Sequence, residues 1–215
     1  AAYLAHADWA VVSASPELFL RRHGDRVETW PIKGTRRRSA SPREDAELAR
    51  ELLASEKDNA ELAMIVDLER NDLGRVCRYG SVRVAAPCVL QSFPTVHHLV
   101  ARVEGRLRPD KDLTDLLEAT FPGGSITGAP KIRAMEIIDE LEPTRRSLYT
   151  GAIGLLGFDG SANLNIAIRT VLCRAGTAFF QAGGGIVADS DPQLELEETS
   201  HKARALMEAL QQASP

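Results

Sequence analysis

The sequence predicts an α+β fold built on antiparallel sheets. The expected strands and helices are clustered along the chain rather than alternating one by one, and short glycine-containing turns separate several neighbouring strands. Such turns favour antiparallel pairing over a doubly wound parallel sheet. The 215 residues are 44% hydrophobic and 26% charged, an ordinary globular composition. With no internal repeat and no clear linker, residues 1–215 are expected to form one domain.

Charge and cysteine content exclude several classes of protein. The formal net charge of −4 gives no reason to expect nucleic acid or an anionic membrane surface as a partner. Cys77, Cys88 and Cys173 lie far apart, without the spacing of a metal site, and are expected to be buried thiols in a reducing compartment. The sequence shows no targeting segment and no apolar run long enough to span a bilayer. These features predict a cytoplasmic protein.

The first third of the chain is expected to contain a hairpin followed by two helices. A strand is predicted over residues 9–13, and strands 18–22 and 26–32 flank a His-Gly-Asp turn. Residues 36–40 form a basic loop, which is either a nucleic-acid patch or, in better agreement with the acidic chain, a solvated turn. Ser41, Pro42 and Glu44 predict a capping box that starts a helix ending near residue 55.

A second helix is predicted over residues 57–69, with Leu62, Ile65 and Leu68 on one face. Residues 70–74 are expected to end this helix. The remaining elements follow in order: two or three strands between residues 76 and 93, a strand over 97–107, a helix over 112–119, a glycine-rich loop over 123–130, a helix over 130–141, a hairpin of strands 151–158 and 163–173, a strand over 177–181, a glycine run over 183–187 and a helix over 191–212.

Lys33 stands out because its neighbours in the sequence are apolar, which is unusual for a solvated charged amine. It follows Trp30, Pro31 and Ile32 and precedes Gly34, which permits unusual backbone angles. A lysine after a strand is usually a solvated surface group. If the amine is desolvated, its pKa falls and it becomes a nucleophile.

Two carboxylate pairs have the spacing that places both members on one helix face. Asp58 and Glu61 are three residues apart on one predicted helix, and Glu195 and Glu198 are three apart on another. A single such pair is usually solvent-facing charge. Two pairs on facing helices would suit Mg²⁺, which takes carboxylate oxygens and water, whereas the lack of nearby His and Cys argues against zinc.

Other groups in the sequence are suited to anions. The amides of Gly183, Gly184 and Gly185, and those of the loop over 123–128, can hold a carboxylate, although such runs are often only tight turns. Arg169 lies in an apolar predicted strand and needs an anion if it faces inward. His98 and Glu17 are ordinarily read as a hydrogen-bonded core histidine and a surface carboxylate.

Taken together, these stretches resemble the chorismate-utilising enzymes. The resemblance covers nearly the whole chain in order, and its motifs are Ser15-Pro16-Glu17, Pro31-Ile32-Lys33-Gly34-Thr35, residues 64–72, His97-His98-Leu99-Val100, residues 124–131, Ile168-Arg169-Thr170 and residues 183–199. It implies the chorismate-binding fold, in which two largely antiparallel sheets form a sandwich flanked by helices. Family members are longer, so the chain is expected to be a C-terminal fragment that lacks the N-terminal part of the fold.

The resemblance also implies roles for individual residues. Lys33 matches the lysine that attacks C2 of chorismate, and Glu17 matches the acid that helps the C4 hydroxyl to leave. Glu61 and Glu198 match direct Mg²⁺ ligands, with Asp58 and Glu195 in support. Residues matched to binding the enolpyruvyl carboxylate or lining the pocket are Tyr149, Arg169, Gly183, Gly184, Gly185, His98, Thr127 and Lys202.

Position 33 decides which member of the family the chain resembles most. Lysine there is typical of component I of the aminodeoxychorismate synthases, which make the precursor of para-aminobenzoate for folate biosynthesis; alanine is typical of the anthranilate, isochorismate and salicylate synthases. No glutaminase Cys-His pair is visible, so ammonia is expected from a separate glutaminase subunit or from solution. Two alternatives remain: an anthranilate synthase of tryptophan biosynthesis, and a non-catalytic chorismate-binding fragment.

Overall fold

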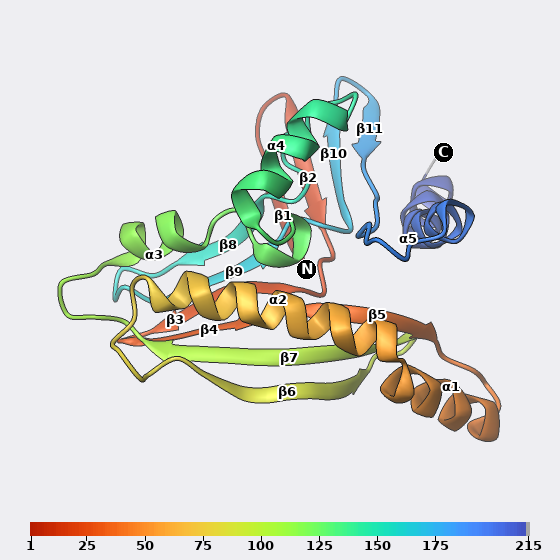
Figure 1. The fold of residues 1–215 in the computed structure, drawn as a ribbon. Coiled ribbons are helices and arrows are strands. Elements are labelled where there is room, and N and C mark those ends of the chain that lie inside the picture. The colour runs from red at the N-terminus through yellow and green to blue at the C-terminus, as the bar shows by residue number, and fades with distance from the viewer. Residues whose placement is uncertain (214–215) are drawn as a thin grey trace. The chain divides into compact units, whose positions relative to one another are not determined.

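The computed structural model describes residues 1–213, which divide into two compact units (Figure 1). One unit, called here the terminal unit, comprises Ala1–Pro16, Glu142–Gly154 and, of the described residues, 165–213. The other, called the central unit, comprises Glu17–Leu141 and Leu155–Leu164. Each unit contains antiparallel strands and at least one helix, which confirms the predicted antiparallel α+β class. Face-to-face packing of the two sheets stays a prediction.

The central unit is organised on a seven-stranded sheet, although residues 152–154 and 165–166 of strands β8 and β9 are counted with the terminal unit. Its order is β5-β7-β4-β3-β9-β8, and β6 also pairs with β7. The strands are β3 (Leu18–His23), β4 (Arg26–Trp30), β5 (Ile32–Arg37), β6 (Arg83–Ser92), β7 (Val96–Arg106), β8 (Ala152–Leu156) and β9 (Ala162–Ile166). Strand β7 is almost entirely buried, with Leu99, Ala101 and Val103 at 0% exposure, and forms the centre of the core.

Strands β4 and β5 run in succession along the same partner, β7. Thr29 pairs with Val103 and Ile32 pairs with Val100, while the amide of Ala101 donates to the Pro31 carbonyl over 3.1 Å. Pro31 separates β4 from β5 because it has no amide hydrogen to donate to β7. The chain nevertheless continues in the same direction, because the Pro31 carbonyl still accepts a hydrogen bond from β7. The prediction that residues 36–40 are a loop is therefore wrong for Arg36 and Arg37, which belong to β5.

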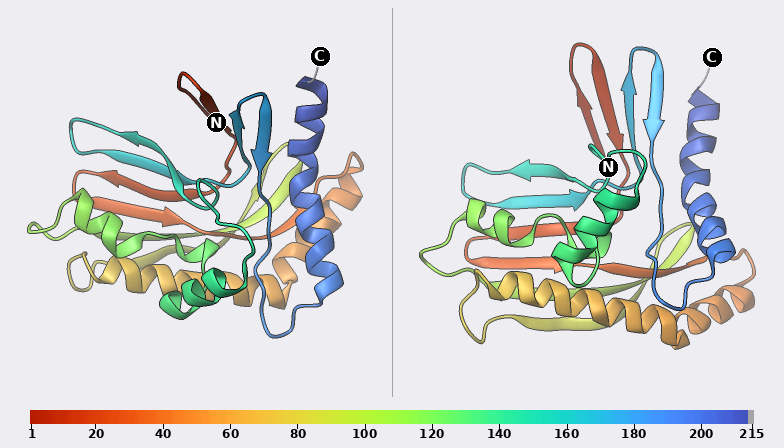
Figure 2. Two further views of the ribbon diagram at one scale, coloured as in Figure 1. Left: turned by 90° about the horizontal axis from the view of Figure 1, so that it is seen from above. Right: turned by 45° about the horizontal axis from the view of Figure 1, so that its top comes forward.

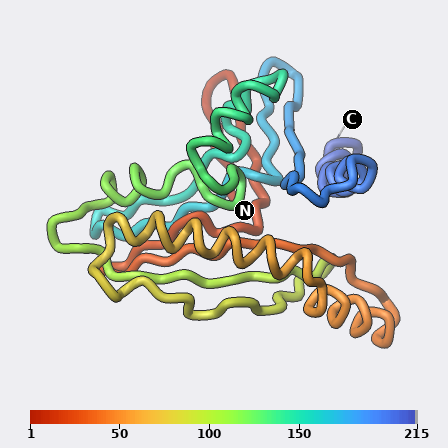
Figure 3. Tube along the Cα trace, in the orientation of Figure 1, coloured from red at the N-terminus to blue at the C-terminus, as the bar shows by residue number. Residues whose placement is uncertain are grey.

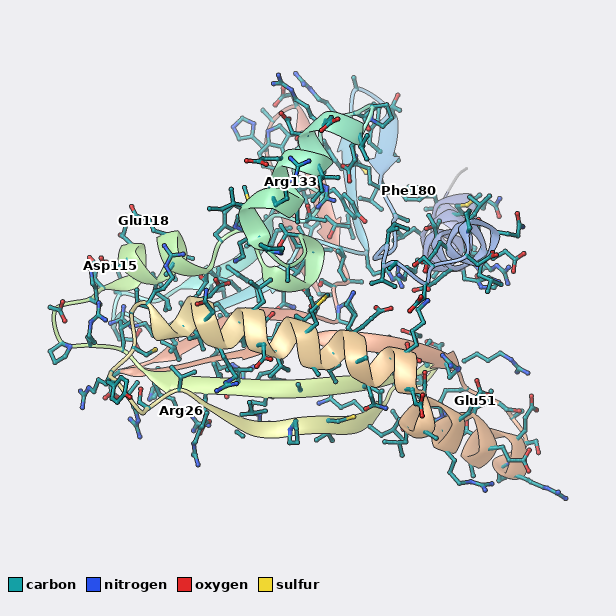
Figure 4. The ribbon with its side chains drawn as sticks, viewed as in Figure 1. Arg26, Glu51, Asp115, Glu118, Arg133 and Phe180 are labelled. Carbon is teal, nitrogen blue, oxygen red and sulfur yellow. The ribbon has the colours of Figure 1, made fainter. Side chains whose placement is uncertain are left out.

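The basic segment is neither a solvated turn nor a free cationic patch. Arg36 contacts Glu51 at 2.8 Å, Arg37 contacts Glu44 at 2.5 Å, and Arg38 contacts Asp45 at 2.8 Å. Glu51, labelled in Figure 4, comes from helix α1 (Pro42–Ala54), as do the other two acids. The three ion pairs thus hold α1 against the end of β5.

Helix α1 begins where predicted, but the predicted capping box does not form. Ser41 occupies the N-cap position without a side-chain cap hydrogen bond, and Pro42 opens the helix. Glu44 instead accepts hydrogen bonds from Arg37 and from the Ser39 hydroxyl. A charged arginine is a stronger partner for this carboxylate than a backbone amide.

Helix α2 (Glu56–Gly74) is longer than the predicted 57–69, since residues 70–74 continue it. Burial of Asp72 and Leu73 explains the extension, because tertiary packing of the last turn outweighs its polar composition. The helix packs on β7, β5 and β6 and lies along one face of the sheet in Figure 1 and in both views of Figure 2. Figure 3 traces the path from β5 through α1 into α2.

The segment between residues 76 and 93 forms one strand, β6, instead of two or three. Its pairing with β7 shifts register twice, between Val84 and Ala86 and again between Ala86 and Val89. Such irregularities bend a strand without ending it, which explains why the pattern suggested several. The remaining elements match expectation closely: α3 (Leu113–Thr120), the 3₁₀ turn η1 (Gly124–Ile126) inside the glycine-rich loop, and α4 (Lys131–Leu141).

The terminal unit contains a four-stranded antiparallel sheet of order β1-β2-β10-β11. Its elements are β1 (Ala2–Ala5), β2 (Trp9–Ser13), β10 (Thr170–Arg174), β11 (Thr177–Phe180) and helix α5 (Pro192–Ala213). The predicted strand over 163–173 is wrong as one element, because the chain breaks between β9 and β10, where Arg169 has a φ of 49°. A β-strand cannot contain a left-handed residue without interruption. Val11, Ile153 and Ala167 form the unit's buried apolar cluster.

Two sequence expectations concern surfaces rather than elements. Among residues 1–213, no helix combines the length and apolar character needed to cross a bilayer. The three cysteines are free thiols, but only Cys77 is buried, so the expectation is wrong for Cys88 and Cys173, which are half-buried. Burial raises the pKa of Cys77 to about 11.

Adjacent leucines of α1 offer a test of which face stabilises the central unit. Leu52 is 0% exposed and Leu53 is 45% exposed. In the full protein that carries this sequence, Leu52→Ala should lower the free energy of unfolding by about 2–5 kcal/mol. Leu53→Ala, with the same change in side chain and helix propensity, should cost less than about 1 kcal/mol. Urea denaturation measures both, and equal losses would contradict the packing of α1.

Candidate functional site

Lys33 lies in β5 immediately before a bulge centred on Gly34. The register between β5 and β7 shifts between Lys33 and Thr35, and Gly34 has a φ of +73°. A β-carbon at Gly34 would lie 2.8 Å from Leu52 Cδ1 and 2.9 Å from Asp58 Cγ. Both the backbone angle and the space require glycine here. Bulges of this kind redirect a side chain, and this one lets β5 approach α1 and α2.

The Lys33 amine faces the first turns of α2. Lys33 Nζ lies 3.6 Å from Glu61 Oε2, and the two side chains are only 16% and 15% exposed. Lys57 Nζ lies 4.0 Å from Glu61 Oε1 on the more exposed side. The amine is therefore largely removed from solvent, as the sequence suggested, but it is ion-paired. Its nucleophilic role stays a prediction.

A second ion pair joins the same two elements. Arg36 Nη2 lies 3.4 Å from Asp58 Oδ2, and Asp58 is 17% exposed. The Asp58 amide is capped by the Ser55 hydroxyl at 3.3 Å. Carboxylates in the first turns of a helix are favoured by its dipole. Helix α2 thus presents Asp58 and Glu61 side by side toward β5, which agrees with the predicted shared face.

His98 and Thr127 are both held by local hydrogen bonds. His98, 7% exposed, has Nδ1 2.9 Å from the Thr35 hydroxyl and 3.3 Å from the Gly34 carbonyl. It is therefore the hydrogen-bonded core histidine, and it supports the backbone next to Lys33. The Thr127 hydroxyl donates to the Gly123 carbonyl over 2.8 Å. Glu17, which precedes β3, is buried at 5% exposure, so the expectation of a surface carboxylate is wrong.

The terminal unit brings its own predicted residues together. Lys202 Nζ lies 2.5 Å from Glu198 Oε1 and donates to the Gly183 carbonyl over 3.3 Å. Arg169 donates through Nη1 to the Lys202 carbonyl over 2.9 Å. Arg169 is thus directed inward, toward α5, and is not a fully exposed surface residue. Burial lowers the pKa of the Arg169 guanidinium, while the neighbouring Tyr149 and Glu198 oppose the shift.

Tyr149 and Glu195 flank the glycine run. A β-carbon at Gly183 would lie 3.2 Å from the Tyr149 hydroxyl, and one at Gly184 would lie 3.1 Å from Glu195 Oε2. Glu195 is buried at 7% exposure and accepts a hydrogen bond from the Ser190 hydroxyl over 2.7 Å. Burial raises the pKa of Tyr149. Gly185 follows in the same loop. The Lys202 amine and the Tyr149 hydroxyl lie near Gly183, and Glu195 lies near Gly184.

The four predicted magnesium ligands are divided between the units. Asp58 and Glu61 belong to the central unit, and Glu195 and Glu198 to the terminal unit. Within residues 1–213, no group of three or more His, Cys, Asp or Glu side chains comes together as a metal cluster. The donors available are hard carboxylate oxygens, which fit Mg²⁺ better than zinc. A magnesium site stays a prediction.

Sequence reasoning missed a buried charged cluster in the central unit. Lys131 Nζ lies 2.5 Å from Asp72 Oδ2, and it donates to the carbonyls of Thr120 and Pro122 over 3.1 and 2.8 Å. Lys131 and Asp72 are only 14% and 5% exposed. Burial raises the pKa of the Asp72 carboxyl, and Lys131 opposes this shift. The pair ties the start of α4 to the end of α2.

Glu69 is the second missed residue. It is 7% exposed, and burial raises the pKa of its carboxyl well above the ordinary value, reinforced by the charges of Glu17 and Asp72. The sequence did contain a signal: Glu69 lies seven residues after Leu62 and four before Leu73, on the buried face of α2. An acid inside such an apolar stripe indicates a special environment.

Comparison with known proteins identifies the family to which the chain belongs. The family model described as chorismate binding enzyme matches residues 1–208. The chain is 56% identical over 203 residues to anthranilate synthase component 1 1 of Haloarcula marismortui and 50% identical over 210 residues to aminodeoxychorismate synthase component 1 of Bacillus subtilis. These alignments cover 94% and 98% of this chain but 42% and 45% of the relatives, so the chain spans less than half of their length.

A solved structure supports the fold. Anthranilate synthase component I from Streptococcus pneumoniae aligns with a TM-score of 0.85 and 43% identity, over 94% of this chain and 45% of that one. The family resemblance drawn from the motifs is confirmed by these matches. The matched relatives include both an anthranilate synthase and an aminodeoxychorismate synthase, so overall similarity does not distinguish between these two reactions.

The buried pair between Asp72 and Lys131 should contribute to stability far more than an exposed pair. Lys131→Met leaves Asp72 as an uncompensated buried charge and should lower the free energy of unfolding by about 3–5 kcal/mol. The exposed pair Arg43–Glu47, at 3.2 Å, provides the control: Arg43→Met should cost less than about 1 kcal/mol. Urea denaturation of the full protein at neutral pH measures both. A loss for Lys131→Met no larger than the control would show that the pair is not buried in solution.

Proposed function

Because this chain belongs to the chorismate-binding enzymes, we propose that it aminates chorismate at C4 to give 4-amino-4-deoxychorismate. The position of Lys33 is the observation that carries the proposal. Its amine is largely removed from solvent, is redirected by the Gly34 bulge and lies beside a carboxylate of α2. Resemblance to aminodeoxychorismate synthase component 1, at 50% identity over nearly the whole chain, supports the same reaction.

The proposed reaction divides one difficult substitution into two easier ones. The Lys33 nitrogen forms a bond to C2, the ring double bonds shift, and the C4–oxygen bond breaks. Ammonia then forms a bond to C4, the double bonds shift back, and the bond between Lys33 and C2 breaks. The sum is chorismate plus ammonia giving aminodeoxychorismate plus water, with Lys33 regenerated.

Glu17 is proposed as the acid for the leaving hydroxyl. Hydroxide is a poor leaving group, so a proton delivered to the C4 oxygen lets it depart as water. The carboxylate of Glu17 can then take back a proton from the nitrogen that has added at C4. His98 and Thr127 are proposed to line the pocket, where hydrogen bonds already hold both side chains in place.

Residues of the terminal unit are proposed to hold the enolpyruvyl carboxylate. Arg169 and Lys202 supply positive charge, Tyr149 supplies a hydroxyl, and the amides of residues 183–185 supply donors. Chorismate is a dianion, and an arginine guanidinium suits bidentate contact with a carboxylate. The convergence of these groups within one unit supports this assignment.

Mg²⁺ is the proposed cofactor for the other carboxylate of the substrate. Glu61 and Glu198 would hold the ion directly, and Asp58 and Glu195 would support it through water. When bound, it would supply positive charge that favours the ring carboxylate. Donor chemistry supports this, since all four residues offer carboxylate oxygens.

Ammonia is proposed to come from a glutaminase subunit, as in other enzymes that separate glutamine hydrolysis from amination. Folate biosynthesis in the cytoplasm is the corresponding proposed pathway and place. The second candidate is anthranilate synthase, which adds ammonia at C2, and it is favoured by the 56% identity to the Haloarcula enzyme. The third candidate is a non-catalytic chorismate-binding protein, which would bind chorismate without converting it.

Lys33→Ala in the full protein should abolish or greatly slow formation of aminodeoxychorismate from chorismate and ammonium salt. Lys57→Ala, which removes the other lysine beside Glu61, should retain most of the activity. Product mass and chromatographic retention distinguish the C4 product from anthranilate. Mass spectrometry of rapidly quenched wild-type enzyme should detect an adduct on Lys33. Normal production of aminodeoxychorismate by Lys33→Ala would exclude the covalent role.

Glu61→Gln should weaken Mg²⁺ binding by at least about tenfold, because an amide oxygen is a poorer ligand than a carboxylate. Glu56→Gln, five residues earlier in the same helix, serves as the control and should leave the affinity unchanged. Calorimetric titration of the full protein with MgCl₂ in the presence of chorismate measures the affinity without requiring turnover. Equal affinity of wild type and Glu61→Gln would remove Glu61 from the proposed site.

A further inference from the structure

The glycine-rich loop between α3 and α4 carries Thr127 on a backbone that is flexible by composition. Three of the six residues 123–128 are glycines, and glycine loses more conformational freedom on folding than any other residue. Gly128 has a φ of +153°, a backbone angle that favours glycine. Such a loop holds a single conformation only when contacts from outside its own backbone offset this loss of freedom.

Lys131, the first residue of α4, makes such contacts at the start of the loop. Its Nζ atom donates to the Thr120 carbonyl over 3.1 Å and to the Pro122 carbonyl over 2.8 Å. The third hydrogen bond of the ammonium goes to Asp72 Oδ2, 2.5 Å away near the end of α2. All three N–H donors are therefore used. One amine joins the two ends of the loop to each other and to α2.

Packing and two hydrogen bonds hold the middle of the loop. A β-carbon at Gly124 would lie 3.0 Å from Leu68 Cδ2, so the loop backbone rests directly on α2. The Thr127 hydroxyl donates to the Gly123 carbonyl over 2.8 Å, and the Thr127 amide donates to the Gly124 carbonyl over 3.3 Å. Gly123 directly follows the second carbonyl that accepts from Lys131. Thr127 is thus attached to the segment that the amine holds.

The contacts of Lys131 are largely shielded from solvent. The side chains of Lys131 and Asp72 are 14% and 5% exposed, and Thr120 is 6% exposed. Hydrogen bonds from a charged donor are stronger than those between neutral groups, and a low local dielectric strengthens them further. A buried carbonyl that loses such a donor has no bulk water to replace it. Loss of the amine should therefore release the start of the loop.

We propose that Lys131 is a positioning residue, which holds residues 120–130 in the conformation that presents Thr127 to the substrate. The inference rests on the proposed function, in which Thr127 lines the pocket. Two parts of the contact have different roles. The ion pair with Asp72 compensates buried charge and contributes to stability, whereas the bonds to the two loop carbonyls carry the positioning.

Removal of both charges separates stability from positioning. In the full protein, Lys131→Met should lower the urea midpoint and kcat/KM for chorismate together. In Asp72→Leu/Lys131→Met no buried carboxylate is left uncompensated, so the midpoint should return most of the way to that of wild type. Its kcat/KM should stay at least about tenfold below wild type, because the two carbonyls still lack their donor and the loop is misplaced. Recovery of both quantities would overturn the positioning role.

Hydrogen exchange followed by mass spectrometry examines the loop without turnover. Amides of residues 123–130 should exchange at least about tenfold faster in Asp72→Leu/Lys131→Met than in wild type. Lys111→Met makes the same substitution at another ion pair of the central unit, 2.7 Å from Asp115 of α3, and should change neither exchange nor kcat/KM. If wild type itself exchanges these amides as fast as an unstructured peptide, the loop is not held, and the proposal is overturned even where no variant of Lys131 folds.

A double-mutant cycle tests whether Lys131 acts through Thr127. Thr127→Val should lower kcat/KM, and its addition to Asp72→Leu/Lys131→Met should cost less than about a further threefold, because both changes disturb the same group. Losses that multiply in full would exclude the route through Thr127. If wild type converts no chorismate, the proposed function fails, and the exchange experiment still decides whether Lys131 holds the loop.

Discussion

Helix α2 can approach β5 only where residue 34 carries no side chain. Leu52 and Asp58 fill the space that a β-carbon at this position would enter, and the φ of +73° excludes most other residues on backbone grounds as well. This close approach makes the ion pairs Lys33–Glu61 and Arg36–Asp58 possible. Gly34 thus sets the surroundings of the Lys33 amine, and the neighbouring His98 holds the same backbone from the β7 side.

Compensation of buried charge governs the rest of the central unit. Helix α2 carries acids along its whole length, and most of them meet a base: Glu61 meets Lys33, Asp58 meets Arg36 and Asp72 meets Lys131. Each pairing offsets the desolvation of two ions, which would otherwise cost several kcal/mol. Glu69 differs, because among the described residues it forms no direct ion pair and burial raises the pKa of its carboxyl group.

Much of the fold was predictable from local patterns, while the breaks within strands were not. Hairpin turns, proline at the start of helices and the apolar stripe of α2 gave the correct elements over most of the chain. The interruption at Arg169 was missed because a positive φ at a non-glycine residue is imposed by tertiary contacts, here by the donation to the Lys202 carbonyl on α5. The basic segment after Gly34 was misread for a similar reason. Three arginines in a row suggest solvation, and only the folded chain places α1 acids beside them.

Site residues were predictable to the extent that they lie in motifs, and Glu69 shows the limit of that approach. Lys33 and His98 were identified from motifs and Glu61 from its spacing to Asp58, and the structure brings them to adjacent positions on β5, α2 and β7. Glu69 lies within the recognised stretch 64–72 but was passed over, because helical spacing alone does not reveal which face will be buried deeply enough to disfavour ionisation. Its significance depends on the packing of β4 and η1 around it.

The choice between amination at C4 and at C2 depends on a small number of positions. Relatives that are 56% and 50% identical to this chain carry the names of the two different enzymes, so the bulk of the shared sequence cannot determine the outcome. In the proposed reaction, the bond from Lys33 occupies C2, and ammonia can then add only at C4. A smaller residue at position 33 would leave C2 open to ammonia. In the proposed reaction, the strand bulge would influence specificity through geometry, because it orients the Lys33 side chain proposed to bond C2. The groups proposed to bind the carboxylates would serve either reaction.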